Sequence, residues 1–227
     1  MAKLGMPTVV VKFIEAGIEA IQRSQRGIVA LILEDTKQVI DKLATKTNGH
    51  EAFLVYTVDD IPEELSDKNK DYILKALKGY NKPPLKVVVY MMQQGGDKAG
   101  ADRFQEPLKA MLTERFDYLA IPTIETAQLE YVATWVKTAR ENKFKKIKVV
   151  LPGSNADYEG VINFGNTKVV TADREYKAAE YTARIAGLVA GTNMIQSATY
   201  APLTEVIDCD RHTQDEMDTM VNEGKFF

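Results

Sequence analysis

The chain has 227 residues, of which 45% are hydrophobic, and its 29 lysines and arginines against 32 aspartates and glutamates give a net charge of −3. This length fits one large domain or two small ones, and it is enough to bury a core without disulfide bridges. The slight acidic excess is not typical of a general nucleic-acid-binding protein. Cys209 is the single cysteine, as is usual in a reducing compartment, and no apolar run of 18 residues predicts a membrane span. The N-terminus also lacks the apolar core of a signal peptide, so we expect a protein made in the cytoplasm.

The first strand-like segment lies close to the N-terminus. Residues 8–14 are apolar and rich in β-branched side chains, and they stand between Pro7 and Gly17. This composition predicts a strand or an extended arm.

Apolar runs then alternate with helical patterns as far as Leu151. The runs are continuous, which is typical of strands covered on both faces of a parallel sheet. Helical spacing follows Ser66, a predicted cap, up to a stop at Gly79, and it recurs at about 106–112 and 124–139. The alternation predicts an α/β fold with a mainly parallel, helix-covered sheet. The predicted strands are 27–33, 52–56, 85–91, 118–121 and 147–151.

The pattern loosens after Leu151. Residues 161–164 and 168–170 predict a hairpin around Gly165-Asn166. A helix is expected from Arg174 to Ala190, capped by Asp173, with a side made of small residues that lets another backbone approach closely. A strand at 205–207 and a helix between Thr213 and Gly224 complete the prediction. The small residues of the long helix are Ala183, Ala186, Gly187 and Ala190.

The sequence offers few residues for catalysis or metal binding. The glycine-rich residues 95–100 match neither phosphate-binding motif, and Gly153-Ser154-Asn155 lacks the second glycine of a nucleophile elbow. The two histidines, His50 and His212, lie in polar segments that predict loops. Cys209 and His212 have the spacing of two zinc ligands, but the sequence contains no second pair. The acidic residues 59–64 predict a solvated loop. We therefore expect no catalytic residue, no metal site and no cofactor.

Four segments, in the same order along the chain, resemble contractile phage tail sheath proteins. The resemblance is strongest to the short sheaths of PBSX-like prophages and R-type bacteriocins, and it covers most of the chain. The segments that carry it are 5–13, 20–33, 148–164 and 181–208.

The resemblance implies a structural, non-enzymatic protein. Such sheath subunits form rings of six that stack around a tail tube and contract to drive it through a cell envelope. The implied partners are other sheath subunits, the tail tube protein, and the baseplate and tail terminator proteins, with no nucleic acid and no direct membrane binding. The implied location is the tail of a virion or of a phage-tail-like particle, assembled in the bacterial cytoplasm.

The resemblance also implies a domain organisation. Residues 1–22 would be an N-terminal arm and linker, 23–207 an α/β sheath domain, and 208–227 the start of a truncated C-terminal domain. The sheath domain would be subtilisin-like without the catalytic residues, and in Gly191-Thr192-Asn193-Met194 an asparagine replaces the nucleophilic serine of a subtilase motif. In this family the arm adds a strand to a neighbouring subunit. The expected inter-subunit strand is Thr8, Val9, Val10, Val11, Lys12, Phe13 and Ile14.

Two other functions remain open at this point. Dispersed polar groups can form a site that no motif reveals, so an α/β enzyme or a small-molecule-binding domain is the alternative. A secreted adhesin or toxin domain is a third hypothesis, which the missing signal peptide disfavours.

Overall fold

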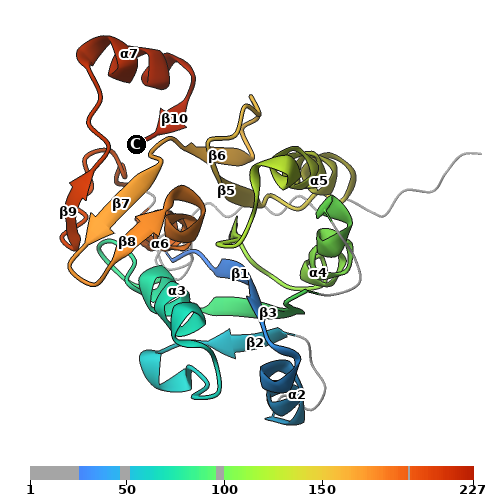
Figure 1. Ribbon diagram of the computed structural model, residues 1–227. Helices are drawn as coiled ribbons and strands as arrows, with labels where there is room; N and C mark the ends of the chain where they lie inside the picture. The colour runs from blue at the N-terminus through green and yellow to red at the C-terminus, as the bar shows by residue number, and fades with distance from the viewer. Residues whose placement is uncertain (1–25, 47–51, 96–99, 194) are drawn as a thin grey trace, which may run out of the picture.

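The computed structural model describes residues 26–46, 52–95, 100–193 and 195–227. Its main sheet has seven strands in the order β10-β6-β5-β4-β1-β3-β2 (Figure 1). Neighbouring strands pair in parallel except β2, which is antiparallel to β3. The predicted parallel sheet is thus confirmed. Its strands are β1 (Val29–Asp35), β2 (Ala52–Val55), β3 (Val87–Gln93), β4 (Tyr118–Ala120), β5 (Lys148–Pro152), β6 (Val161–Phe164) and β10 (Lys225–Phe226).

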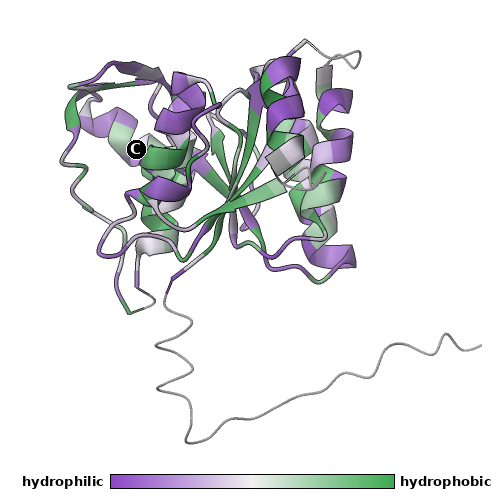
Figure 2. Cartoon of the chain, turned by 90° about the horizontal axis from the view of Figure 1, so that it is seen from below, coloured by the Kyte–Doolittle hydropathy of each residue, from purple (hydrophilic) through white to green (hydrophobic). Residues whose placement is uncertain are grey.

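Helices cover both faces of this sheet. Because successive strand residues point to opposite faces, Val29 and Leu31 of β1 join one core cluster while Ala30 and Ile32 join the other. Figure 2 shows the hydrophobic strands between helices whose outer sides are hydrophilic. The helices on the first face are α2 (Lys37–Lys46), α3 (Asp67–Leu77) and α6 (Ala178–Gly191), and those on the second are α4 (Gln105–Met111) and α5 (Leu129–Asn142). Three short 3-10 helices are η1 (Val58–Asp60), η2 (Gly100–Phe104) and η3 (Thr126–Gln128).

A smaller antiparallel sheet lies beside the main one. Its strands have the order β8-β7-β9, and they are β7 (Lys168–Thr171), β8 (Glu175–Lys177) and β9 (Val206–Cys209). The chain continues from β9 into α7 (Gln214–Asn222) and returns to the main sheet as β10. Thr213 caps α7 as predicted, because its side chain accepts a hydrogen bond from the Glu216 backbone N–H.

The predicted hairpin around Gly165-Asn166 is wrong. β6 pairs with β5 and β10 in the main sheet, whereas β7 pairs with β8 and β9 in the smaller one. A two-residue hairpin turn of the commonest type needs positive φ at both central residues, and neither Gly165 nor Asn166 has it. The two residues instead carry the chain from one sheet to the other.

The predicted helix from Arg174 starts too early. Residues 175–177 form β8, and α6 begins at Ala178. Asp173 lies in the turn between β7 and β8, where its N–H donates to the Thr171 hydroxyl, so it does not cap the helix. The end of the helix is close to the prediction, since α6 ends at Gly191.

Because β1, β3, β4 and β5 run in the same direction, their beginnings and their ends lie on opposite sides of the main sheet. We name as the carboxyl edge the side where β1, β3, β4 and β5 end, and as the amino edge the side where they begin. β3 lies on one side of β1 and β4 on the other, so the connections diverge at β1. In open α/β sheets, ligands bind at the carboxyl edge at such a switch point.

No helix in the described part of the chain is long and apolar enough to cross a membrane.

Candidate functional site

A cleft of about 740 Å³ opens at this switch point. Its lining includes Asp35 at the end of β1, Gln94 after β3 and Pro122 after β4. The first residues of α3 and the start of α6 form the other walls, with Asn69 and Glu180 among the lining side chains. The cleft is therefore where an enzyme of this architecture would hold its substrate.

Asp35 is the buried carboxylate of the cleft, and the chain itself saturates it. Its two oxygens accept hydrogen bonds from the backbone N–H of Thr36 at 2.8 Å, from that of Ser66 at 3.0 Å and from the Asn69 amide at 2.9 Å. Burial acts to raise the pKa of Asp35, but these hydrogen bonds outweigh it and lower the pKa below its ordinary value. Asp35 thus joins the end of β1 to the starts of α2 and α3.

Asn69 cannot relay a proton to or from Asp35. An asparagine amide has no titratable group in the physiological range, so it cannot act as a general base. The Asn69 amide nitrogen also donates to the Glu34 carbonyl oxygen at 2.9 Å, which fixes its orientation. Of the histidines, His50 lies outside the described residues, and the ring nitrogen of His212 lies 3.4 Å from the Asn166 amide oxygen, in the C-terminal part of the chain.

Two further carboxylates of the cleft, Glu34 and Glu180, are paired as well. Glu34 forms an ion pair with Arg103 and accepts a hydrogen bond from the Thr123 hydroxyl. Glu180 accepts two hydrogen bonds from Arg174, each of 3.2 Å, and one of 2.7 Å from the Tyr72 hydroxyl. Burial acts to raise the pKa of Glu180, but these contacts outweigh it and hold the pKa below its ordinary value. The arrangement therefore stabilises the ionised forms of Asp35 and Glu180.

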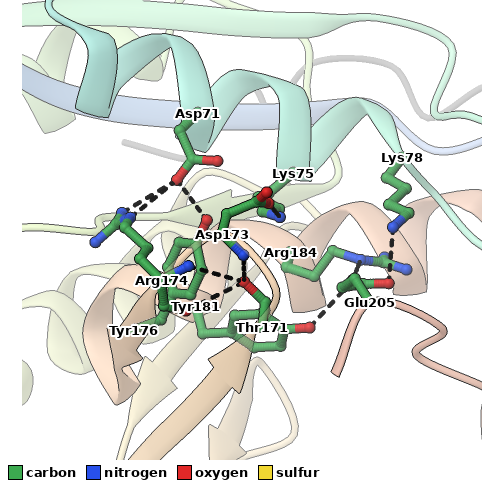
Figure 3. A network of polar contacts seen from close by, with 10 residues as sticks. All are labelled: Asp71, Lys75, Lys78, Thr171, Asp173, Arg174, Tyr176, Tyr181, Arg184 and Glu205. Carbon is green, nitrogen blue, oxygen red and sulfur yellow. Dashed lines mark hydrogen bonds and ion pairs between the residues drawn. The ribbon is translucent and has the colours of Figure 1, made fainter. Parts of the chain in front are cut away.

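A polar network extends from the cleft between α3, α6 and the smaller sheet (Figure 3). Arg174 donates to Asp71 of α3 at 3.1 Å, and its guanidinium lies 4.0 Å from the centre of the Tyr176 ring. The Tyr176 hydroxyl donates to the same Asp71 oxygen at 2.7 Å. This half of the network attaches the β7–β8 turn to α3.

The other half of the network centres on Glu205, just before β9. Its carboxylate pairs with Arg184 of α6 and with Lys78, and it accepts a hydrogen bond from the Tyr181 hydroxyl. The Arg184 side chain is 4% exposed and that of Glu205 is 8% exposed. Burial acts to raise the pKa of Glu205, but the hydrogen bonds from Lys78 and Arg184 lower it to about 2.

The residues singled out from the sequence do not gather in the cleft. The expected inter-subunit strand 8–14 and residues 96–99 lie outside the described residues. Ser154 is buried in a turn, where its backbone N–H donates to the Asn163 side chain at 2.8 Å. Cys209 is exposed on β9, and the described residues contain no group of three or more potential metal ligands.

The subtilase-like residues Gly191-Thr192-Asn193 lie at the wrong end of the sheet for catalysis. α6 ends at Gly191, and the adjacent Ala190 carbonyl accepts a hydrogen bond from Gly27, which precedes β1. This is the amino edge, opposite the cleft. The match to the nucleophile motif therefore has no active-site geometry.

Sequence reasoning missed the polar pairs that shape this region. Asp35 lies at the end of a buried strand, and Asn69 is the third residue after the Ser66 cap, so both positions could have been noted. Their contact joins residues 34 positions apart. Glu205 lies 21 positions from Arg184, and no local pattern predicts that pair.

Comparison with known proteins identifies the class. Residues 97–227 match the family model of the phage tail sheath protein central domain. The tail sheath protein of Clostridium phage phiCD119 (strain Clostridium difficile/United States/Govind/2006) is 33% identical over 226 residues, which is 97% of this chain and 58% of that protein. The chain belongs to the phage tail sheath protein family, which confirms the resemblance seen in the sequence. It spans less than two thirds of the length of this relative.

Solved structures show the same fold. The crystal structure of the sheath tail protein from Desulfitobacterium hafniense superposes with a TM-score of 0.71 at 20% identity, over 98% of this chain and 71% of that one. The cryo-EM structure of the anti-feeding prophage helical sheath in its contracted state gives a TM-score of 0.58 at 13% identity, over 97% of this chain and 63% of that one. The mainly parallel α/β architecture is thus one that sheath proteins use.

Proposed function

We propose that this chain is a structural subunit of the contractile tail sheath of a phage or of a phage-tail-like bacteriocin. Subunits assemble as stacked rings of six around the tail tube, and contraction of the sheath drives the tube through the target envelope. The observation that carries the proposal is the match to the tail sheath family, through the family model and through a relative aligned with nearly the whole chain. The cleft supports it, because three of its lining carboxylates, Asp35, Glu34 and Glu180, are occupied by the chain's own donors.

The proposed partners follow from this function. They are further copies of the sheath subunit, the tail tube protein, and the baseplate and tail terminator proteins, with no nucleic acid and no direct membrane contact. The subunit works in the tail of the particle and is assembled in the bacterial cytoplasm. We also infer that residues 1–22 serve as an arm and linker, that 23–207 form a subtilisin-like sheath domain without catalytic residues, and that 208–227 lead into a C-terminal domain.

Electron microscopy of native particles tests this function. Antibodies raised against the chain and labelled with gold are added to particles purified from lysed cells that carry the gene. Labels spaced along the striated outer layer of a tail are the expected result. Labels confined to the end of the tail, or absent from all particles, would contradict the proposal.

The segment Thr8–Ile14 gives a prediction about the link between subunits. An apolar strand at a chain end needs the edge of another sheet for its backbone groups, and we infer that a neighbouring subunit supplies it. In the longer protein that carries a C-terminal domain, Val9→Pro and Val10→Pro remove backbone donors that point to opposite sides of the strand, so one of the two variants loses a donor that faces the neighbouring sheet. Electron microscopy should then show folded subunits that no longer form sheaths.

The control for this prediction is a substitution that keeps the backbone donor. Val9→Thr and Val10→Thr preserve the N–H group and the β-branched shape, so sheaths should form normally. If both proline variants also form sheaths of normal stability, the segment does not connect the subunits.

A further inference from the structure

Phe144 combines two features that the fold does not explain. The residue is 86% exposed, and its backbone has φ of +54°, a conformation that bulky L-residues rarely adopt. It follows the end of α5, where the Lys145 N–H donates back to the Ala139 carbonyl at 3.2 Å and closes the helix. Glycine is the usual residue at such a helix end. A glycine would satisfy the fold here, so the phenyl ring has no role within the described chain.

Three lysines flank Phe144 in the sequence. Lys143 and Lys146 are exposed, and the Lys145 ammonium donates a hydrogen bond of 3.2 Å to the Glu114 carbonyl oxygen. We name residues 143–146 the Phe144 knob. It lies at the amino edge, because β5 begins at Lys148, whose N–H donates to Asp117 just before β4.

A groove lies at the opposite end of the same β4–α5–β5 unit. It has a volume of about 560 Å³ and runs between the first half of α5 and residues 153–158, which follow β5 at the carboxyl edge. Leu129, Ala133 and Tyr158 give it an apolar wall. Glu130 and Asp157 line it as exposed acids, while Lys137 lies over the Tyr158 ring at 5.9 Å. We name it the 153–158 groove.

We propose that the Phe144 knob of one subunit docks in the 153–158 groove of a second copy of this chain. The inference rests on the proposed function, since it names a contact by which sheath subunits would associate. The lining of the groove on α5 ends at Lys137, about 10 Å along the helix from Phe144, and the knob lies at the opposite end of the β4–α5–β5 unit, so one molecule does not fill its own groove. The contact is therefore head-to-tail, and repetition of such a contact produces rings or open helices.

The charges of the rim and the apolar wall of the groove favour this occupant. The knob carries three lysines that flank an aromatic residue, and the groove presents Glu130 and Asp157 beside an apolar wall. Opposite charges at the rim guide the encounter, while an aromatic anchor in a pocket supplies most of the affinity of a typical interface. The left-handed backbone at Phe144 directs the ring away from its own domain. This conformation is strained, and contacts at an interface would offset the strain.

Cross-linking between two different single-cysteine variants tests the contact. In a Cys209→Ser background, Asn142→Cys places a thiol beside the knob and Asn155→Cys places one at the groove, and both native residues are exposed. The two proteins are mixed with a short bismaleimide and analysed by mass spectrometry. We expect the mixed dimer to exceed the dimers formed by either variant alone by about tenfold, because a head-to-tail contact brings the unlike positions together.

Phe144→Gly in the Asn142→Cys protein separates docking from folding. The mixed dimer should fall about tenfold, while the melting temperature stays the same or rises, because glycine adopts this backbone without strain. The matched control is Tyr200→Gly, which removes another aromatic that is 99% exposed with φ of +59°. This control should leave the cross-link unchanged.

A charge reversal, Lys146→Glu, should weaken the mixed dimer, and Asp157→Lys on the groove partner should restore it.

Three results would overturn the proposal. They are equal cross-linking in the mixture and in the single variants, an unchanged cross-link after Phe144→Gly, and an equal loss after Tyr200→Gly. The gold-labelling experiment distinguishes this failure from that of the proposed function. Labelled tails together with no specific cross-link would leave the sheath role standing and remove only this contact.

Discussion

Replacing Gly187 by leucine should lower the free energy of unfolding by about 3 kcal/mol, the upper part of the usual range for overpacking. Gly187 lies on α6 where the helix crosses α3, and a Cβ atom at this position would be 2.1 Å from the Ala76 carbonyl oxygen. That oxygen belongs to a helix backbone packed on the sheet, so it cannot move aside cheaply. Urea denaturation with an unchanged m-value would measure the loss.

Neighbouring positions give the comparison that this prediction needs. Ala186 is fully buried on the same helix, and Ala186→Leu should cost about 1–3 kcal/mol. Thr138→Leu adds similar bulk on the exposed side of α5 and should change the stability by less than about 0.5 kcal/mol. If Gly187→Leu unfolds at the same urea concentration as Thr138→Leu, then α3 and α6 are not in the close contact described here.

The close contact between α3 and α6 was predictable from the sequence. The small residues Ala183, Ala186, Gly187 and Ala190 predict a helix that another backbone approaches closely, and all four are buried. The parallel sheet was equally predictable, because its inner strands carry continuous apolar runs such as Val87–Met91. Local composition suffices for features of this kind because burial on both faces leaves a signal in every residue.

Other elements were missed where the local signal was short or ambiguous. α2 was not predicted, although Val39, Ile40 and Leu43 have helical spacing and pack against the core. β8 was absorbed into a predicted helix, since only Tyr176 marks it as a strand. β6 and β7 belong to different sheets because β6 pairs with β5 and β10 while β7 pairs with β9. No residue near Gly165 predicts these pairings.

The candidate site was less predictable than the fold. Sequence motifs gave no triad or zinc pattern to pursue, and they gave no indication of the cleft or its polar pairs. Asp35 meets Ser66 and Asn69 only because the sheet order brings β1 next to α3. The same holds for Arg184 and Glu205, whose ion pair links a helix to the segment before β9. Such pairs are tertiary contacts between common residue types, so no spacing rule identifies them.

The second large effect is expected at Glu205. Glu205→Gln should lower the free energy of unfolding by about 3–5 kcal/mol, because it leaves the buried Arg184 guanidinium without its counter-charge. Arg184 retains a hydrogen bond of 2.7 Å to the Gly79 carbonyl, which limits the loss but supplies no charge. Urea denaturation near neutral pH measures the difference. The control is Asp208→Asn, which breaks an exposed ion pair of 3.7 Å to Arg211 and should cost less than about 1 kcal/mol.

The pH dependence of that difference identifies its cause. The pKa of Glu205 is about 2 in the folded protein and 4.5 when unperturbed, so the unfolded chain takes up the proton more readily. The stabilisation is therefore complete above pH 4.5 and is lost as the pH falls from 4.5 towards 2. The gap in unfolding free energy between the parent and Glu205→Gln should stay constant above about pH 5 and shrink below it. A gap that is the same at every pH would show that glutamine disturbs packing rather than charge, and the ion pair would not be what holds the segment before β9 against α6.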